Sequence, residues 1–243
     1  MRLLNFGVVF CLAVFFSGSL HAGSYVEADV ADGGSISGTV KVKGDIPADE
    51  IKEVKKNKAQ CGETIDAEKY VISAAGEVKW AVAMLEGIGE GKKLDKLADV
   101  LIDNNGCRFK PHVLVAPTGG KLQVKNSDPM LHNSHFFMII DSKKKNVINL
   151  ALPKKGQVIA KKKILRKPGL LSVECDAHDF MQGYVWSLPH PYGAVTDEKG
   201  AFKLTDIPAG TYTLKVWHEA LGEKTSSVTV KPGEDTKVMI EYE

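Results

Sequence analysis

The stretch Pro208-Ala-Gly-Thr-Tyr-Thr-Leu-Lys-Val216 predicts a turn followed by a strand. Proline and glycine favour the tight reversal, and the residues after them alternate between apolar and polar side chains, as a half-buried strand requires. The same alternation recurs at residues 35–42, 121–125 and 227–230, with turn residues at 197–200 and 231–233. Helical periodicity is weak and short by comparison. The sequence therefore predicts an all-β fold of the sandwich type.

The length and composition leave room for one large domain or two small ones. The chain has 243 residues, of which 44% are hydrophobic and 26% charged, and this composition excludes disordered, collagen-like and coiled-coil proteins. The 32 basic and 30 acidic residues give a formal net charge of +2. With no strong overall field, the sequence does not favour nucleic acid or a membrane surface as a partner.

The first 22 residues have the pattern of an export signal. Arg2 precedes an apolar run at 3–16, small residues follow at 17–22, and we expect cleavage after Ala22. The apolar run is shorter than the roughly 18 to 20 residues that span a bilayer, and no later segment is apolar for long enough. We therefore expect an exported protein, most simply periplasmic or else extracellular, with no membrane span in the mature chain. A retained anchor is the alternative.

Removal of the signal segment takes Cys11 with it and leaves three cysteines in the exported chain. Compartments outside the cytosol permit disulfides. Cys61 and Cys107 lie in surface-like loops, whereas Cys175 follows the apolar strand at 170–173. We expect a disulfide between Cys61 and Cys107 and a free thiol at Cys175, although the other two pairings stay open on the sequence alone.

The last fifty residues resemble the carboxypeptidase regulatory-like domains of the prealbumin-like type, on the segments at 194–204 and 207–214. The resemblance implies a small seven-stranded sandwich. In such a domain the first strands are followed directly by a hairpin like the one around residues 196–200. Here about a hundred residues intervene after the strand at 81–85. We therefore expect a sandwich made of residues 24–94 and 189–243, with a second β domain inserted at 95–188. Two sequential domains divided near residue 189 are the alternative.

The inserted segment carries residues that suit a metal. His132 and Asn133 lie together, and 43 residues after His132 comes Cys175-Asp-Ala-His178-Asp-Phe-Met181. A tight loop can aim the thiolate, imidazole and thioether of this second motif at one point. With an imidazole from a distant strand, they match a trigonal copper site with a weak axial methionine.

At these residues the sequence resembles the cupredoxins, the blue-copper family of plastocyanin and amicyanin, and so implies a Greek-key β domain inserted in the prealbumin-like sandwich. The resemblance implies one mononuclear copper, with His132, Cys175 and His178 as equatorial ligands and Met181 as the axial one. Asn133 would connect the two ligand segments without binding the metal. One departure is Asp179, where many relatives with this short loop have proline.

Other roles for these residues stay open. His135 competes with His132, because residues three apart on a strand point to opposite faces and only one of them can face the metal. His112 is a further, weaker candidate. A zinc site built from Cys175 and histidines, or a nucleophilic Cys175, would use the same residues. Zinc would leave Met181 without a role, and no His-Asp pair that would orient a base for the cysteine is apparent.

The segment 141–167 is strongly basic. It holds ten Lys or Arg residues and one acidic residue, Asp141. Such a patch can steer an acidic redox partner such as a c-type cytochrome, or it can protect exposed strand edges from aggregation.

The sequence thus predicts an exported type 1 copper protein that carries single electrons between redox partners and is not an enzyme. One alternative is a β-sandwich module that binds carbohydrate or a cell-surface polymer, with no metal or a structural one. Trp80, Trp186 and Trp217 would be candidates for its stacking face. Copper storage or delivery is the other alternative.

Overall fold

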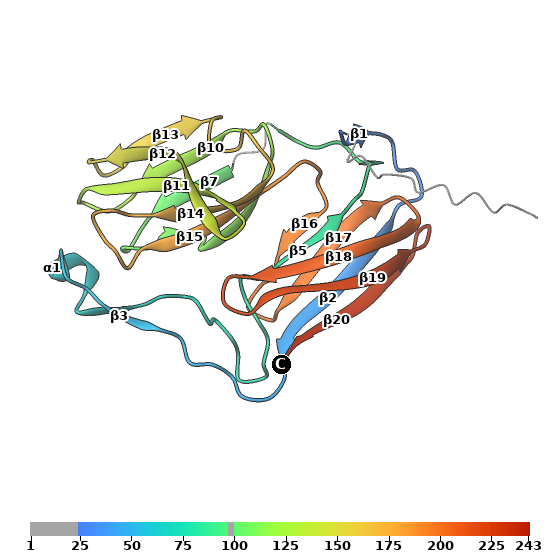
Figure 1. Ribbon diagram of the computed structural model, residues 1–243, viewed down its shortest axis with the longest axis horizontal. Coiled ribbons are helices and arrows are strands. Elements are labelled where there is room, and N and C mark those ends of the chain that lie inside the picture. The colour runs from blue at the N-terminus through green and yellow to red at the C-terminus, as the bar shows by residue number, and fades with distance from the viewer. Residues whose placement is uncertain (1–23, 97–99) are drawn as a thin grey trace, which may run out of the picture.

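The computed structural model describes residues 24–96 and 100–243, and the expected signal segment 1–22 lies outside them. The fold is almost entirely β, as predicted, and consists of two bodies of packed sheets (Figure 1). In the part of the chain that the structure describes, no helix is long and apolar enough to cross a membrane.

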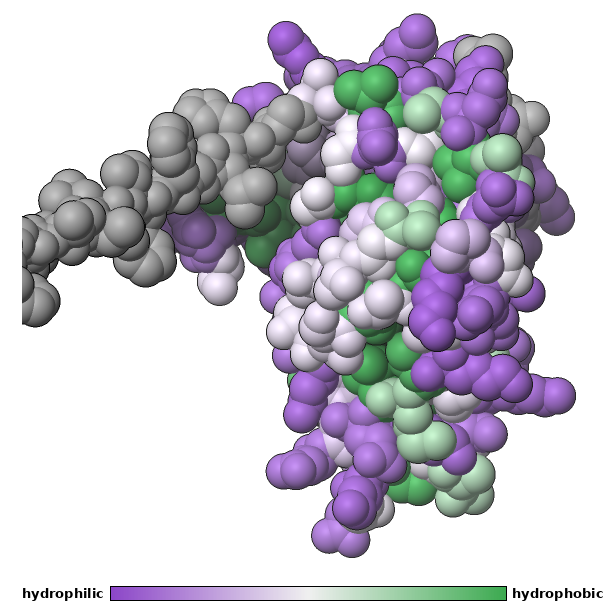
Figure 2. Space-filling view, turned by 90° about the vertical axis from the view of Figure 1, so that its right-hand side faces the viewer, coloured by the Kyte–Doolittle hydropathy of each residue, from purple (hydrophilic) through white to green (hydrophobic). Residues whose placement is uncertain are grey.

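The first sandwich pairs a four-stranded sheet, β16-β5-β18-β19, with a three-stranded sheet, β17-β2-β20. Its strands are β2 (Gly34–Val42), β5 (Val82–Glu86), β16 (Gly193–Val195), β17 (Ala201–Ile207), β18 (Gly210–His218), β19 (Gly222–Val230) and β20 (Asp235–Tyr242). Residues 208–216 form the turn into β18 and most of this strand. Tyr192 and Leu214 are fully buried between the two sheets. Figure 2 shows an outer face on which hydrophilic residues surround a narrow, broken band of apolar ones.

The second sandwich pairs a five-stranded sheet, β12-β11-β14-β15-β9, with a four-stranded sheet, β13-β10-β7-β8. Its strands are β7 (Val100–Asn104), β8 (Phe109–Lys110), β9 (Val113–Pro117), β10 (Leu122–Asn126), β11 (His132–Ile140), β12 (Lys143–Leu152), β13 (Val158–Lys161), β14 (Gly169–Glu174) and β15 (Gln182–Leu188). A short parallel pair, β1 (Val26–Glu27) and β6 (Glu90–Gly91), lies outside both sandwiches.

Residues 51–66 form an arm of the chain, and the sandwich on which this arm packs differs from the expected one. The arm contains β3 (Ile51–Glu53), α1 (Lys58–Cys61) and β4 (Thr64–Asp66), and the predicted division assigned it, with residues 24–94, to the first sandwich. In the structure its buried side chains, Val54 and Ile65, belong to the core of the second sandwich. Figure 1 shows the arm extending away from the first sandwich so that α1 lies near one end of the second.

The two sandwiches meet through aromatic and apolar side chains. Trp217 is buried between them, and its ring contacts those of Tyr184 and Trp186 at centroid distances of 5.2 and 5.8 Å. Trp80 packs against the same cluster. The three tryptophans therefore belong to the contact between the sandwiches, and they do not form an open stacking face.

Most of the basic segment 141–167 lies far from the start of β11. β11 runs from His132 to Ile140, a length of about 26 Å at roughly 3.3 Å per residue. The turn after it leads into the lysines at 143–145, and the basic residues at 161–167 follow β13 at the same end. Only Lys154 and Lys155 follow β12 at the His132 end, because Leu152 pairs with His132.

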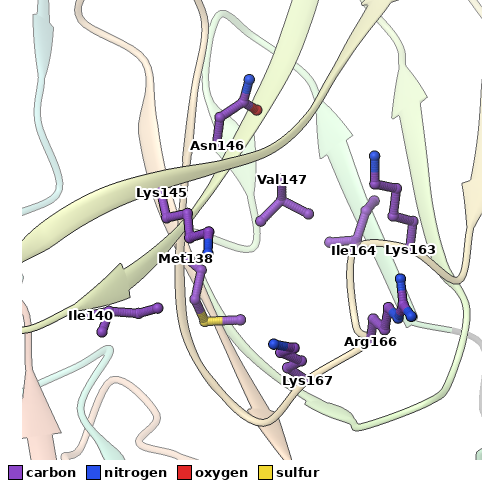
Figure 3. Close-up of a pocket in the computed structure, with 9 residues that line it drawn as sticks. All are labelled: Met138, Ile140, Lys145, Asn146, Val147, Lys163, Ile164, Arg166 and Lys167. Atoms are coloured by element: carbon purple, nitrogen blue, oxygen red, sulfur yellow. The ribbon is translucent and has the colours of Figure 1, made fainter.

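This basic end of the second sandwich contains a small pocket of about 230 Å³ (Figure 3). Apolar side chains, among them Met138, Val147 and Ile164, line it, and cationic side chains stand around it. The cations are Lys145, Lys163, Arg166 and Lys167.

Candidate metal centre

The loop between β14 and β15 presents three potential ligands from seven residues. Its backbone closes on itself, because the Cys175 carbonyl accepts from the His178 N–H at 3.1 Å and the His178 carbonyl accepts from the Met181 N–H at 2.9 Å. The Cys175 N–H in turn donates to the Met181 carbonyl at 3.4 Å. These bonds hold a tight loop, so its three side chains have a defined orientation.

Pairing of β11 with β14 brings His132 to this loop. The two strands are antiparallel, with His135 opposite Glu174, so the start of β11 lies beside the residues that follow β14. The Cys175 sulfur is 3.9 Å from His132 Nδ1 and 3.6 Å from His178 Nδ1. One potential ligand atom from each residue lies within 4.8 Å of the others, and the three residues are 0 to 2% exposed. They form a buried site that could hold a metal ion.

Each imidazole is oriented by a hydrogen bond from its outer nitrogen. His132 Nε2 donates to Asp128 at 3.0 Å, and His178 Nε2 donates to the side-chain oxygen of Asn57 at 2.8 Å. A proton on Nε2 leaves Nδ1 with a free lone pair, which in both residues faces the Cys175 sulfur. Such partners commonly fix the tautomer and orientation of metal-binding histidines.

Asn133 connects the two ligand segments. Its backbone N–H donates to the Cys175 sulfur at 3.5 Å, and its side-chain oxygen accepts from the Ala177 N–H at 3.2 Å. Its amide nitrogen donates to Asp176 at 3.0 Å. Asn133 therefore links the start of β11 to the loop that carries Cys175.

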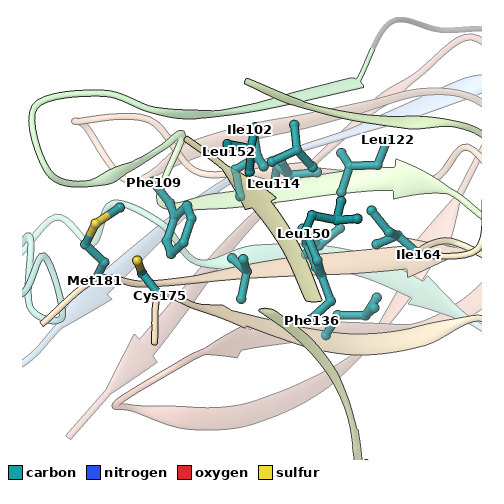
Figure 4. Packing of buried hydrophobic residues seen from close by; sticks show 14 of the residues in the cluster. Ile102, Phe109, Leu114, Leu122, Phe136, Leu150, Leu152, Ile164, Cys175 and Met181 are labelled. Atoms are coloured by element: carbon teal, nitrogen blue, oxygen red, sulfur yellow. The ribbon is translucent and has the colours of Figure 1, made fainter. Parts of the chain in front are cut away.

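Met181 lies at the same end of the core as Cys175. It is 3% exposed and belongs to the buried cluster of the second sandwich. Figure 4 shows Met181, Cys175 and Phe109 on the same side of this cluster. The fourth residue of the expected ligand set thus lies in the same buried cluster as Cys175.

His135 and His112 are held elsewhere. His135 Nδ1 contacts Asp176 at 3.1 Å, and its ring stacks against Phe137 at a centroid distance of 4.0 Å. His112 contacts Glu219 of the first sandwich. Neither histidine is part of the buried cluster found among the described residues.

The electrostatics of the cluster favour neutral groups. Burial lowers the pKa of His132, and the hydrogen bond to Asp128 offsets only part of this effect. Burial also lowers the pKa of His178. Burial raises the pKa of the Cys175 thiol, although three backbone N–H groups act in the opposite direction.

The other cysteines are joined to each other. Cys61 and Cys107 form a disulfide with their Cα atoms 5.6 Å apart, and Cys175 is a free, buried cysteine. The backbone N–H of Cys107 also donates to Asp128 at 2.9 Å, so the disulfide lies next to the carboxylate that orients His132.

Two residues of the centre, Asp128 and Asn57, were not predicted from the sequence. Asp128 lies four residues before His132 in a turn rich in polar side chains, a spacing that could have suggested the contact. Asn57 lies 121 residues from His178, and no feature of the sequence connects the two.

The comparison with family models identifies the last part of the chain. Residues 187–243 match the carboxypeptidase regulatory-like domain, which confirms the family expected for the last fifty residues. No protein with a curated description matches the chain.

Solved structures similar to this chain include amicyanin, a purple cupredoxin and a copper-containing nitrite reductase. Amicyanin from Paracoccus versutus is 19% identical with a TM-score of 0.32, over 37% of this chain and 82% of that chain. A purple cupredoxin from Nitrosopumilus maritimus is 20% identical with a TM-score of 0.32, over 37% of this chain and all of that chain. A copper-containing nitrite reductase from Thermus scotoductus is 22% identical with a TM-score of 0.30, over 40% of this chain and 24% of that chain.

Proposed function

We propose that this protein binds one copper ion in a type 1 site and carries single electrons between redox partners. The observation that carries the proposal is the convergence of the Cys175 sulfur with the Nδ1 atoms of His132 and His178. Met181 belongs to the same buried cluster as Cys175. One thiolate, two imidazoles and a weak thioether suit both oxidation states of copper. Copper supplies the one-electron exchange, and the protein supplies a buried, hydrogen-bonded set of ligands.

Zinc is less well supported by the same residues. Structural zinc sites have four ligands and commonly include two or more cysteines. Among the described residues Cys175 is the only free thiol, because Cys61 and Cys107 are joined. The thioether of Met181, in the same buried cluster as Cys175, is a soft ligand that copper uses and zinc does not need.

The disulfide supports export. Disulfides persist in the periplasm and outside the cell and are rare in the cytosol. Together with the signal-like segment 1–22, the Cys61–Cys107 bond favours a periplasmic protein.

An acidic redox protein, such as a c-type cytochrome, is the partner that we propose for the basic segment 141–167. Lys163 and Lys167 beside the pocket of Figure 3 have no carboxylate partner among the described residues. At about 230 Å³ the pocket is smaller than the roughly 300 to 1,000 Å³ of typical small-molecule sites, which suits side chains of a protein partner. Because most of these cations lie at the end of β11 away from His132, their role is to steer the encounter.

The experiment is copper loading followed by optical and paramagnetic-resonance spectroscopy. The purified mature protein with Cu(II) should develop an intense blue thiolate band that ascorbate bleaches reversibly. Cys175→Ser should abolish the band, whereas the double variant Cys61→Ser with Cys107→Ser should keep it. A colourless complex with unchanged affinity in Cys175→Ser would reject the proposal.

A matched pair of histidine variants tests the choice of ligand. His132→Gln should abolish the blue band, and His135→Gln, three residues along the same strand, should leave it. The reverse result would assign the ligand to His135. Slow release of the bound ion to a competing acceptor would favour the electron carrier, whereas rapid release would favour copper storage or delivery.

A further inference from the structure

The arm, residues 51–66, lies over the outer side of His178. It comes from a distant part of the sequence, yet Val54 is fully buried in the core of the second sandwich. The Cys61–Cys107 disulfide fastens one end of α1 to the loop before β8. Arg108, next to that cysteine, forms an ion pair with Asp66 at 3.5 Å. The arm is therefore anchored by apolar, covalent and ionic contacts on the sandwich that contains the metal centre.

Asn57 is the residue of the arm that contacts a proposed ligand. It precedes α1 in a left-handed conformation, with φ of 58°, and its side chain makes no hydrogen bond that would cap the helix. The side-chain oxygen instead accepts from His178 Nε2 at 2.8 Å. Asparagine tolerates this backbone conformation better than most residues, and here the conformation coincides with a side chain directed at the imidazole.

The ligand loop also contacts the arm through an ion pair. Lys55 forms an ion pair with Asp179 at 2.9 Å, at the position where relatives of this loop often have proline. This pair is two-thirds exposed, so it contributes little stability. Its value lies in showing that arm and loop face each other directly beside His178.

A narrow opening remains between the arm and the loop. A cavity of about 110 Å³ is lined by Lys55 and Lys56 from the arm and by His178 and its neighbours from the loop. His178 is nonetheless only 2% exposed. Removal of the arm would uncover the edge of this imidazole, because Asn57 contacts the nitrogen that points away from the Cys175 sulfur.

We infer that the arm is a cover for the metal centre, in which Asn57 is a positioning residue that keeps the proton of His178 on Nε2 and the Cys61–Cys107 disulfide keeps the cover closed. Asn57 leaves Nδ1 free to bind the metal, and the arm slows the exchange of the bound ion with solutes. The statement about ion exchange rests on the proposed copper site. The statements about the tautomer and the closure of the arm apply to the metal-free protein as well.

Asn57→Gly is the sharpest test, because glycine keeps the left-handed backbone and removes the whole side chain, including the amide oxygen that accepts from His178. Ser142→Gly is the matched control, since Ser142 has φ of 61° in the turn at the far end of β11. In metal-free protein, nitrogen NMR of the imidazoles should show His178 as the Nε2–H tautomer in the wild type and as a mixture in Asn57→Gly. Asn57→Asp keeps an acceptor oxygen and should restore the wild-type tautomer.

Metal affinity provides the second measurement on the same variants. Loss of a hydrogen-bond partner behind a ligand typically weakens metal binding roughly 10-fold to 100-fold. We expect a loss of this size in copper affinity for Asn57→Gly and none for Ser142→Gly, measured by competition with a Cu(I) chelator. An unchanged tautomer together with an unchanged affinity in Asn57→Gly would overturn the positioning role. If the protein failed to bind copper at all, the tautomer result would still decide that role.

The disulfide is tested with the double variant Cys61→Ser and Cys107→Ser. Without this crosslink, which spans 46 residues of sequence, we expect the amides of the arm to exchange with deuterium roughly 10-fold faster or more, while those of β18 in the first sandwich stay unchanged. Transfer of copper to the chelator should accelerate in parallel. Equal amide exchange in the arm of both proteins would show that the disulfide does not hold the cover.

Discussion

Asp128 accepts a hydrogen bond from His132 Nε2 at 3.0 Å and also from the backbone N–H groups of Gly106 and Cys107 at 2.8 and 2.9 Å. One nearly buried carboxylate therefore joins an expected metal ligand to the loop that carries the disulfide.

Replacement of Asp128 should affect stability and metal binding together. Asp128→Ala leaves the Gly106 and Cys107 N–H groups unpaired, so we expect the free energy of unfolding to fall by about 2 to 4 kcal/mol. Copper affinity should fall roughly 10-fold to 100-fold, because His132 loses its orienting partner. Urea denaturation of the metal-free protein and a copper titration measure the two effects.

The control for that variant is Asp235→Ala. Asp235 accepts hydrogen bonds from the hydroxyl groups of Ser35 and Ser37 in the first sandwich, on the exposed surface. Asp235→Ala should lower the free energy of unfolding by about 1 kcal/mol or less, which is well below the loss expected for Asp128→Ala. It should leave copper affinity unchanged. Equal effects of both variants on affinity would contradict the role of Asp128.

Met181→Leu should separate packing from metal chemistry. Leucine has a similar volume and stays apolar, so we expect the free energy of unfolding of the metal-free protein to change by less than about 1.5 kcal/mol. Loss of the thioether disfavours Cu(II) more than Cu(I), and the reduction potential should rise. Voltammetry and the optical spectrum of the copper form measure the change.

Met84→Leu is the matched control for this prediction. Met84 is also a buried methionine, but it lies in the cluster between the two sandwiches. Its replacement should have a similar small effect on stability and none on the potential. An unchanged potential in Met181→Leu would remove Met181 from the ligand set.

His218 should make the stability of the metal-free protein depend on pH. Burial lowers its pKa from 6.5 to about 4, and the nearby His112 acts in the same direction. Between these two values the unfolded chain binds more protons than the folded protein, so stability falls as the pH is lowered from about 6.5 towards 4. The loss from His218 alone is about 3 kcal/mol.

His218→Asn tests this pH dependence. His218 Nδ1 accepts from the Ala220 and Leu221 N–H groups at 3.3 Å each, and the asparagine side-chain oxygen can accept in its place. Urea denaturation at pH 7 and pH 5 should show a smaller difference for the variant than for the wild type. The same difference in both proteins would assign the pH dependence to other groups.

The basic end of the second sandwich should control association with an acidic partner. The double variant Lys163→Glu with Lys167→Glu should lower the association rate roughly 10-fold at low ionic strength, because it reverses charge beside the pocket. Stopped-flow electron transfer with an acidic c-type cytochrome measures the rate, and added salt should reduce the difference.

The control carries the same change in net charge on the first sandwich. Lys199→Glu with Lys237→Glu should alter the rate much less, since both lysines lie outside the second sandwich. Equal rates for the two double variants would show that net charge alone matters and would leave the basic end without a steering role.

Much of the fold could be predicted because strands are encoded locally. The alternation at 35–42 lies within β2, and that at 211–216 lies within β18. The ligand loop was also visible in the sequence, because Cys175, His178 and Met181 lie within seven residues. A short loop restricts where its own side chains can go.

The orientation of the ligands could not be predicted in the same way. The sequence contains Asn57 and His178 without any sign that they meet, and the expected domain division placed the arm with the other sandwich. The contact depends on where Val54 is buried and on the disulfide to Cys107. Such long-range packing has no local pattern.

The sequence by itself determined the β architecture, the potential ligands and the strongly basic segment 141–167. Only the tertiary structure decided that most of this basic charge lies at the end of β11 opposite His132, that His112 pairs with Glu219, and that an arm covers His178. The physical reason is that periodicity specifies which side chains of a strand turn inward, whereas the neighbours they meet depend on how sheets and connecting segments pack across the whole chain.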